Sequence, residues 1–340
     1  MKLKKIILSI IAIVIILGLV FAIVKSGEKK QKDTNKIQIV VSNFASYDFL
    51  RAIIGDNDNI ELTFLMGPGK DSHSYDPTAG DLIKIQNADL FVYVGGEMEK
   101  WSGKVINSID TNDTKIICIS DYVDTIEEQN IDGVEGEEEH HHNDNTENEN
   151  ESEESKKYEH EEGSFDEHIW TSPKNAIKMV NSLEKAMEDL DKENAEIYAK
   201  NAQNYIEKIK IVDNQIKEIV DNKVRDRLVF ADKMPMQYFI NYYNLKVSAA
   251  FSGCSTETEP SANTIAYLEK IIKEEKIPVV LYIELNNGKV ANTIAEDLGE
   301  EVEAMQIQTL HNVSLDDFKN GETWVTLMTR NIDVIKKALK

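Results

Sequence analysis

ENAEIYAKNAQNYIEKIKIVDNQIKEIVD, residues 193–221, is the stretch of this 340-residue chain that organises the rest. Its apolar side chains recur at alternating steps of four and three residues, at Tyr198, Ala202, Tyr205, Ile209, Val212, Ile216 and Ile219. That spacing predicts one amphipathic helix, about 43 Å long at 1.5 Å per residue. The seam of a coiled-coil dimer has the same spacing. We prefer a single rigid helix that joins two flanking lobes once and limits bending between them.

Short apolar runs of strand length alternate with helical patterns on both sides of this helix. Before it, we expect strands at 37–41, 60–65, 89–94 and 115–119 and helices at 44–54, 78–87 and 98–109. After it, we expect strands at 228–230, 245–250 and 279–283 and helices at 264–275 and 290–298. Strands separated by helices imply right-handed crossovers and a parallel sheet. The sequence therefore predicts an α/β fold of two βα lobes with parallel sheets, at residues 37–192 and 222–340.

The first 36 residues predict an N-terminal membrane anchor and spacer. Residues 6–24 are uncharged and follow a short lysine-rich head, and 19 residues are enough to cross the core of a bilayer. No small-residue cleavage site follows this run. We expect a helix over residues 6–24 that tethers the chain to the extracytoplasmic face of the cell membrane. If the segment is cleaved, the protein is secreted.

The net charge of −23 is concentrated in the first lobe, in a loop at residues 124–163. That loop holds 17 acidic residues and two lysines, a net of −15, which leaves −8 for the rest of the chain. The rest of the chain is therefore mildly acidic, which argues against a nucleic-acid partner. The loop is poor in apolar residues and is predicted to be disordered. We interpret its four histidines as a weak metal-collecting loop: His140, His141, His142 and His160.

The other three histidines stand singly, each in a turn-like context next to an apolar segment. His73 follows the expected strand at 60–65, His168 precedes a helix start at Ser172-Pro173, and His311 lies in a late loop of the second lobe. The carboxyl edge of a parallel sheet is where such folds bind ligands. A neutral imidazole is the commonest protein ligand for zinc. We therefore predict one pocket of three histidines at the interface of the lobes.

These segments resemble the ZnuA/TroA-like solute-binding proteins of zinc and manganese ABC importers. The motif His-x-Tyr-x-Pro-Thr occurs at residues 73–78, and acidic-x-His-x-Trp-x-x-Pro occurs at residues 166–173. A histidine-rich acidic insertion lies between them, as in the zinc-specific members. The resemblance covers residues 37–339. It implies a monomeric, non-enzymatic two-lobed receptor that holds a metal ion between its lobes and delivers it to a membrane permease.

One segment, VFADKMP at residues 229–235, departs from the pattern of the group. Members usually present a third ligand there, often a histidine, and the resemblance therefore implies that His311 fills the second-lobe position. The fourth ligand is left open between Asp232, Glu284 and a water. We prefer Asp232, for which a helix N-cap is the other role. Candidates to accept the second imidazole N–H are Asp71, Asp76 and Glu167.

The chemistry of this ligand set favours Zn²⁺. Three imidazoles with at most one carboxylate suit tetrahedral zinc, whereas Mn²⁺ prefers more oxygen ligands. An exported zinc metallohydrolase would use a similar set with Glu167 as its base, although the sequence has no His-Glu-x-x-His. A metal-binding surface adhesin is the other alternative. Cys118 and Cys254 are either free or joined in a disulfide.

Overall fold

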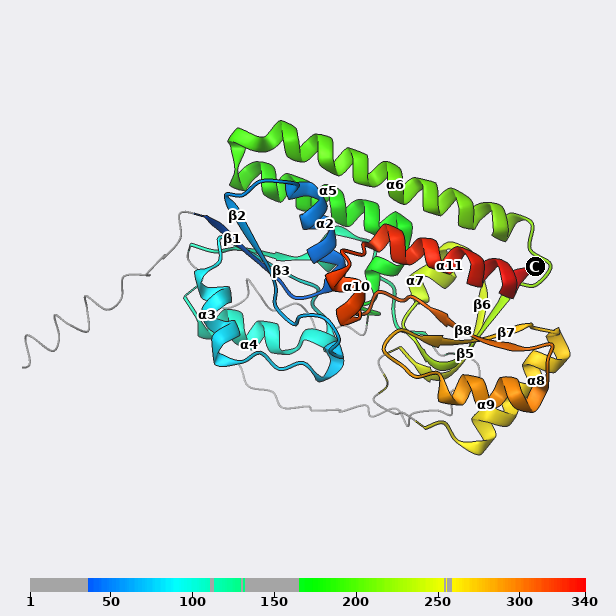
Figure 1. Cartoon of the computed structure of the whole chain (residues 1–340). Coiled ribbons are helices and arrows are strands. Elements are labelled where there is room, and N and C mark those ends of the chain that lie inside the picture. The colour runs from blue at the N-terminus through cyan, green and yellow to red at the C-terminus, as the bar shows by residue number, and fades with distance from the viewer. Residues whose placement is uncertain (1–35, 111–112, 130, 132–164, 254, 256–258) are drawn as a thin grey trace, which may run out of the picture. The chain divides into compact units, whose positions relative to one another are not determined.

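The described residues of this chain form two four-stranded parallel β-sheets, each flanked by helices (Figure 1). The computed structural model describes residues 36–110, 113–129, 131, 165–253, 255 and 259–340. The predicted α/β fold, with two parallel sheets and a long connecting helix, is confirmed.

The first lobe is built on β1 (Ile37–Val41), β2 (Ile60–Phe64), β3 (Leu90–Tyr93) and β4 (Lys115–Cys118). The strands lie in the order β2-β1-β3-β4, and all neighbours are parallel. The crossovers are α2 (Phe44–Ile54), α3 (Ala79–Asn87) and α4 (Trp101–Ser108). Every residue of β3 is buried, as expected for an inner strand that is covered on both faces.

The second lobe repeats this plan with β5 (Arg227–Met234), β6 (Lys246–Ser252), β7 (Val279–Ile283) and β8 (Glu303–Ile307), in the order β6-β5-β7-β8. Its helices are α7 (Gln237–Tyr242), α8 (Ala262–Glu275), α9 (Lys289–Leu298) and α10 (Leu315–Lys319), and α11 (Trp324–Leu339) follows. The chain enters each sheet at an inner strand, β1 or β5, and later strands are added on both sides. Such a switch point opens a crevice at the carboxyl edge of the strands. His73 follows β2 and His311 follows β8, so both histidines leave that edge of their sheet.

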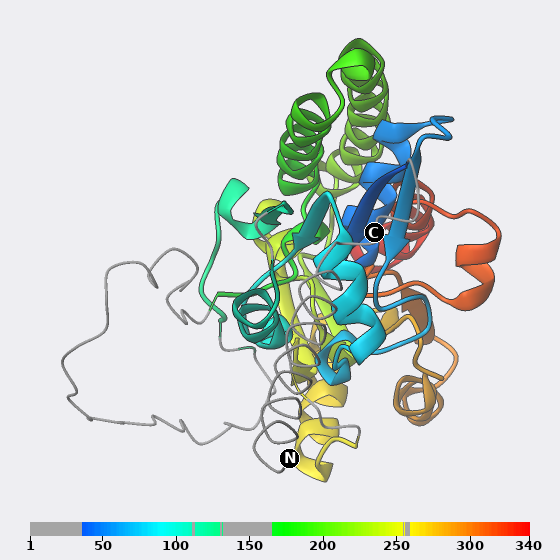
Figure 2. The same cartoon turned by 90° about the vertical axis from the view of Figure 1, so that its left-hand side faces the viewer.

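Helix α6 (Ala195–Asp221) connects the lobes and is close to the predicted range of 193–221. Its 27 residues span about 40 Å, and all seven positions of the predicted apolar stripe are buried. It packs beside α5 (Pro173–Leu190) and α2 of the first lobe and against α11 (Figures 1 and 2). Two tyrosines of the second lobe, Tyr242 and Tyr243, donate hydrogen bonds to the Asp213 carboxylate of α6. One helix is therefore anchored to both lobes.

Several sequence predictions fall on residues that the structure does not describe. These are the membrane helix at residues 6–24, the histidines of the acidic loop and Cys254. None of the described helices has the length and apolar character needed to cross a membrane. Cys118 is a buried free thiol at the end of β4, where its S–H donates to the Val94 carbonyl.

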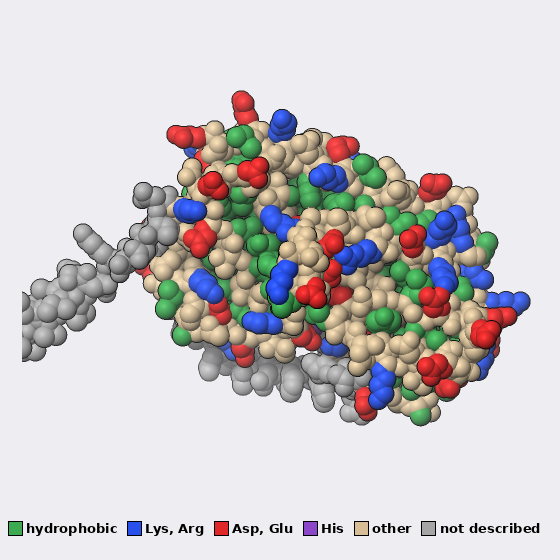
Figure 3. Space-filling view, viewed as in Figure 1, with side chains coloured by type: hydrophobic (Ala, Val, Ile, Leu, Met, Phe, Trp, Pro, Cys, Tyr) green, Lys and Arg blue, Asp and Glu red, His purple; other side chains and the backbone are tan. Residues whose placement is uncertain are grey.

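The surface drawn in Figure 3 carries lysine and arginine side chains interspersed with aspartate and glutamate. Neither sign forms a large patch on this face. Among the described residues, several exposed charges pair along one helix, such as Lys210 with Glu207 and Lys273 with Glu269. Exposed pairs of this kind contribute little to stability, so the fold depends on the buried faces of its helices.

Replacement of Ile209 by alanine should test how far α6 stabilises the whole unit. Ile209 is fully buried, so we expect the free energy of unfolding to fall by about 2–4 kcal/mol. Ile211 lies on the same helix but is 59% exposed, and Ile211→Ala should change that free energy by less than about 0.5 kcal/mol. Urea denaturation of both variants makes the comparison. Equal losses from the two substitutions would contradict this assignment of the buried face.

Candidate metal site

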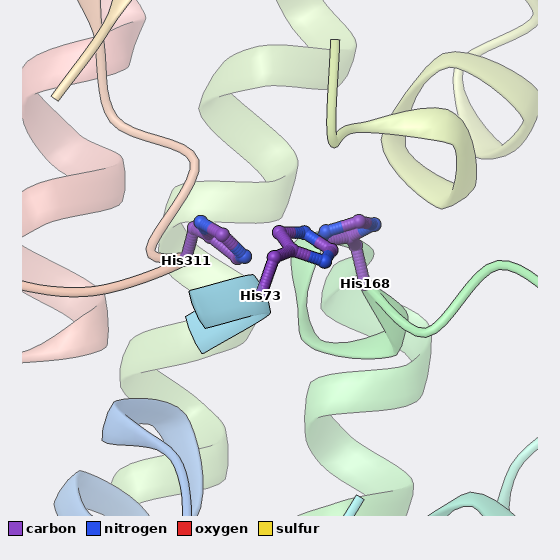
Figure 4. Close-up of side chains that lie close together, drawn as sticks. All are labelled: His73, His168 and His311. Atoms are coloured by element: carbon purple, nitrogen blue, oxygen red, sulfur yellow. The ribbon is translucent and has the colours of Figure 1, made fainter. Parts of the chain in front are cut away.

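His73, His168 and His311 meet where the two lobes adjoin (Figure 4). One ring nitrogen from each histidine lies within 4.8 Å of the corresponding nitrogens of the other two. The ring centroids are separated by 4.8 Å for His73 and His311, 5.2 Å for His168 and His311, and 5.8 Å for His73 and His168. Within the described part of the chain, this is the one cluster of histidine, cysteine or acidic side chains arranged to hold a metal ion.

His73 is presented by a short 3-10 helix, η1 (Ser72–Ser74), in the loop after β2. Asp71 caps this helix, because its Oδ1 accepts the backbone N–H of His73 at 2.9 Å. Ser72 is buried, and its Oγ lies 2.5 Å from Nε2 of His311. The first-lobe loop therefore contacts the second-lobe histidine directly.

His168 is fully buried and is oriented by a carboxylate two residues before it. Asp166 Oδ1 accepts the backbone N–H of His168 at 2.8 Å and lies 3.1 Å from the ring Nδ1. With Nδ1–H donated to Asp166, the lone pair of Nε2 is available to a metal ion. A carboxylate in this position is the usual support of a zinc-binding imidazole.

The segment around His168 is fixed by side chains and backbone of the second lobe. Tyr238 donates to the carbonyl of Asp166 at 2.7 Å, and the indole of Trp170 donates to the carbonyl of Thr309 at 3.0 Å. Gly253 packs against the His168 ring, since a Cβ at that glycine would lie 3.3 Å from His168 Cε1. A larger residue at 253 would push on the imidazole.

His311 is held by a buried carboxylate at the end of β7. Glu284 accepts the backbone N–H of His311 at 2.9 Å and both the N–H and the hydroxyl of Thr309, at 2.7 and 2.8 Å. Leu310, between them, has a φ of +57°, an uncommon conformation for a leucine. The neighbouring Asn312 donates to the carbonyls of Gly67 and Lys70, which attaches this loop to the loop that carries His73.

Burial keeps two of the three imidazoles neutral. Burial, followed by the charge of His168, lowers the pKa of His73 to about 4, and burial lowers the pKa of His311 well below its ordinary value. Burial also acts to lower the pKa of His168, but the carboxylates of Asp166, Glu167 and Glu128 together outweigh it and the net shift is upward. The Nε2 atoms of His73 and His168 are buried and have no hydrogen-bond partner in the described part of the chain. Buried nitrogens of this kind fit a metal ion.

The structure does not bring Asp232 or Glu284 into the histidine cluster. Asp232 accepts the backbone N–H groups of Lys233 and Ile283, at 2.8 and 3.1 Å, so it joins β5 to β7. Its predicted alternative, a helix N-cap, is also not what the geometry shows, because Lys233 still belongs to β5. Glu284 supports the His311 loop. Burial raises the pKa of both carboxyl groups.

None of the three carboxylates predicted to accept an imidazole N–H is seen in that role among the described residues. Asp71 caps the η1 helix, Asp76 is exposed, and Glu167 accepts the backbone N–H of Met98 at 3.1 Å. Sequence reasoning missed Asp166 in that role, although an aspartate two residues before a histidine is well placed for a local side-chain bond. Ser72, Tyr238 and Trp170 gave no sequence signal as parts of the pocket, because only the fold brings them there.

Comparison with known proteins agrees with this geometry. The family model described as "Zinc-uptake complex component A periplasmic" matches residues 39–338. This chain belongs to that family. The family membership predicted from the two histidine motifs is confirmed.

Two curated relatives of the family are each 30% identical to this chain. The high-affinity zinc uptake system protein ZnuA of Bacillus subtilis aligns over 94% of this chain and 94% of its own length. The zinc-binding lipoprotein AdcA of Streptococcus pneumoniae aligns over 93% of this chain, which spans only 58% of the AdcA length. The crystal structure of the Zn(II)-bound ZnuA-like domain of that AdcA superposes with a TM-score of 0.69 at 27% identity, covering 89% of this chain and 99% of the domain.

Two matched substitutions separate the supporting role of Glu284 from direct coordination by Asp232. Glu284→Gln replaces one acceptor oxygen by an amide N–H that opposes the Thr309 and His311 donors, so zinc affinity should fall about 10- to 100-fold. Asp232→Asn should change the affinity by less than about threefold, since its contacts are to backbone N–H groups at the β5–β7 junction. Competition with a chromophoric chelator measures both values. A loss of zinc affinity of a hundredfold or more in Asp232→Asn would show that Asp232 is a ligand after all.

Proposed function

We propose that this protein is an extracytoplasmic zinc receptor that delivers the ion to the membrane permease of an ABC importer. The observation that carries the proposal is the convergence of three imidazoles from both lobes on one buried point. The names of the relatives, which describe zinc binding and zinc uptake, support the same cargo.

The proposed ligands are His73, His168 and His311. Nitrogens that bind tetrahedral zinc at 2.0–2.1 Å are about 3.3 Å apart. The corresponding nitrogens of this cluster lie within 4.8 Å, so small side-chain movements would close the shell. An all-imidazole set favours zinc over manganese, which prefers oxygen ligands. The fourth position remains for a water or another small ligand.

The proposal includes a membrane tether and the absence of catalysis. Residues 6–24 would hold a monomeric receptor at the extracytoplasmic face, beside the permease that it loads.

A hydrolase would need a base next to the metal. Glu167, the residue considered for that role, accepts the backbone N–H of Met98 instead. We therefore propose a binding protein with no enzymatic activity.

Single alanine substitutions of His73, His168 and His311 test the proposed ligands. Each should weaken zinc binding at the tight site at least 100-fold, because the site loses one of its three protein ligands. Titration calorimetry with a competing chelator measures the affinity and the number of sites. Circular dichroism should show an unchanged fold. A variant that keeps the wild-type affinity would remove that histidine from the site.

Deletion of residues 134–157 tests the separate role of the acidic loop. This segment lies outside the described residues, and we propose that it collects zinc weakly. The deletion should remove the weak sites and leave one tight site with unchanged affinity, since the three pocket histidines lie elsewhere. A triple substitution of His140, His141 and His142 by alanine is the conservative companion. Loss of the tight site in either variant would refute this division of roles.

A further inference from the structure

Lys233 places a positive charge beside the metal pocket. It lies near the carboxyl end of β5 in the second lobe, and its side chain is only 15% exposed. Its ammonium lies 3.6 Å from Oδ2 of Asp71, in the loop of the first lobe that carries His73. The other oxygen of Asp71 accepts the backbone N–H of His73. An ion pair between the lobes thus involves a residue only two positions before a proposed ligand.

The backbone next to Lys233 also approaches a second histidine. The carbonyl oxygen of Met234, the residue after Lys233, lies 3.2 Å from the position that a Cβ of Gly253 would occupy. Cε1 of the His168 ring lies 3.3 Å from the same position. The end of β5 and the imidazole therefore face each other across one glycine.

The ammonium of Lys233 is close to the loop that carries His73. It lies 3.6 Å from one oxygen of Asp71, and the other oxygen of that carboxylate lies 2.9 Å from the backbone nitrogen of His73. A positive charge at this position repels a divalent cation in the pocket, and the repulsion is twice that on a singly charged ion because Coulomb energy scales with charge. Partial burial weakens the screening of this repulsion by solvent and salt.

The carboxylates of this region are each engaged with other groups. Asp71 pairs with Lys233 directly, and Asp166 is engaged with the His168 ring. Glu284 accepts N–H and O–H groups of the His311 loop, and Asp232 accepts backbone N–H groups at the β5–β7 junction. A receptor that must give up its cargo gains from a repulsive charge, because binding that is too tight prevents release.

We propose that Lys233 sets the rate of metal release: its ammonium, paired with Asp71 beside the loop of His73, lowers the affinity for a divalent cation and speeds its dissociation. Lys233 acts through the field that it imposes on the ligands and is itself no ligand. The inference rests on the proposed zinc-binding function and adds to it a determinant of how long the ion stays bound.

The sign of the effect distinguishes this role from a purely structural one. An ion pair that merely holds the lobes together would, on removal, loosen the pocket and weaken zinc binding. Removal of a repulsive charge strengthens it. Lys233→Met deletes the charge and keeps the length and apolar character of the side chain. Lys233→Arg keeps the charge and the pairing with Asp71 and is the matched control.

The experiment measures zinc affinity by chelator competition, and zinc dissociation by stopped flow into excess chelator, on the full chain. We expect Lys233→Met to bind Zn²⁺ about tenfold more tightly, with most of the gain in slower dissociation, and Lys233→Arg to stay within about threefold of wild type. Asp71→Asn keeps an oxygen to cap His73 but leaves Lys233 unneutralised, so it should bind Zn²⁺ more weakly than wild type.

Unchanged or weaker binding in Lys233→Met overturns the proposal and leaves Lys233 as a structural clamp. If circular dichroism shows that this variant does not fold, Lys233→Gln takes its place under the same criteria. Absence of a tight zinc site in the wild-type protein would overturn the proposed function together with this inference. Tight wild-type binding that is lost in Lys233→Met overturns this inference alone.

Discussion

The structure depends on buried hydrogen bonds that hold the ligand loops of one lobe against the other. The indole of Trp170 donates to the carbonyl of Thr309, and the indole of Trp324 donates to the carbonyl of Trp170, so the segment after His168 is joined to the segment before His311. Because all of these groups are buried, breaking any one bond leaves an unpaired polar group away from water. The backbone positions of the three histidines are thus set by the fold, and only small side-chain movements are left for an arriving ion.

The same principle operates along the long helix. Asp48 of α2 is completely buried, and it accepts the hydroxyl of Tyr205 in α6 and the backbone N–H of Trp324 at the start of α11. Arg51 pairs with the other Asp48 oxygen at 2.6 Å and donates to the carbonyl of Glu322. Burial raises the pKa of Asp48 even against these partners. One carboxylate thereby ties together α2, α6 and the connection into α11, which restricts movement of the lobes about α6.

The sequence predicted the parts of this fold that follow from periodicity. The stripe of α6 and the apolar runs of β1 and β7 matched the structure within two residues, because burial on one face or on both leaves a regular pattern. Strand β8 was missed: its sequence, Glu303–Ile307, mixes two polar residues with three apolar ones without a regular alternation and is only partly buried, as suits an edge strand. The three histidines of the pocket could be recognised in the sequence by their residue type. The residues that hold them in place could not. Tyr238 and Thr309 meet the His168 segment through tertiary contacts, and nothing in their local sequence marks that role.

Burial has opposite consequences for the imidazoles and for the carboxylates around them. It favours neutral His73 and His311, which is the form that binds metal, and it penalises every free carboxylate near the pocket. Asp232 and Glu284 are accordingly occupied by backbone or hydroxyl donors instead of facing the ring nitrogens. In the proposed site, such a pocket would bind a metal ion through imidazole nitrogens and would have little negative charge to spare for a cation. Its preference therefore follows from the chemistry of imidazole, which selects zinc over cations that need oxygen ligands, and not from electrostatic attraction.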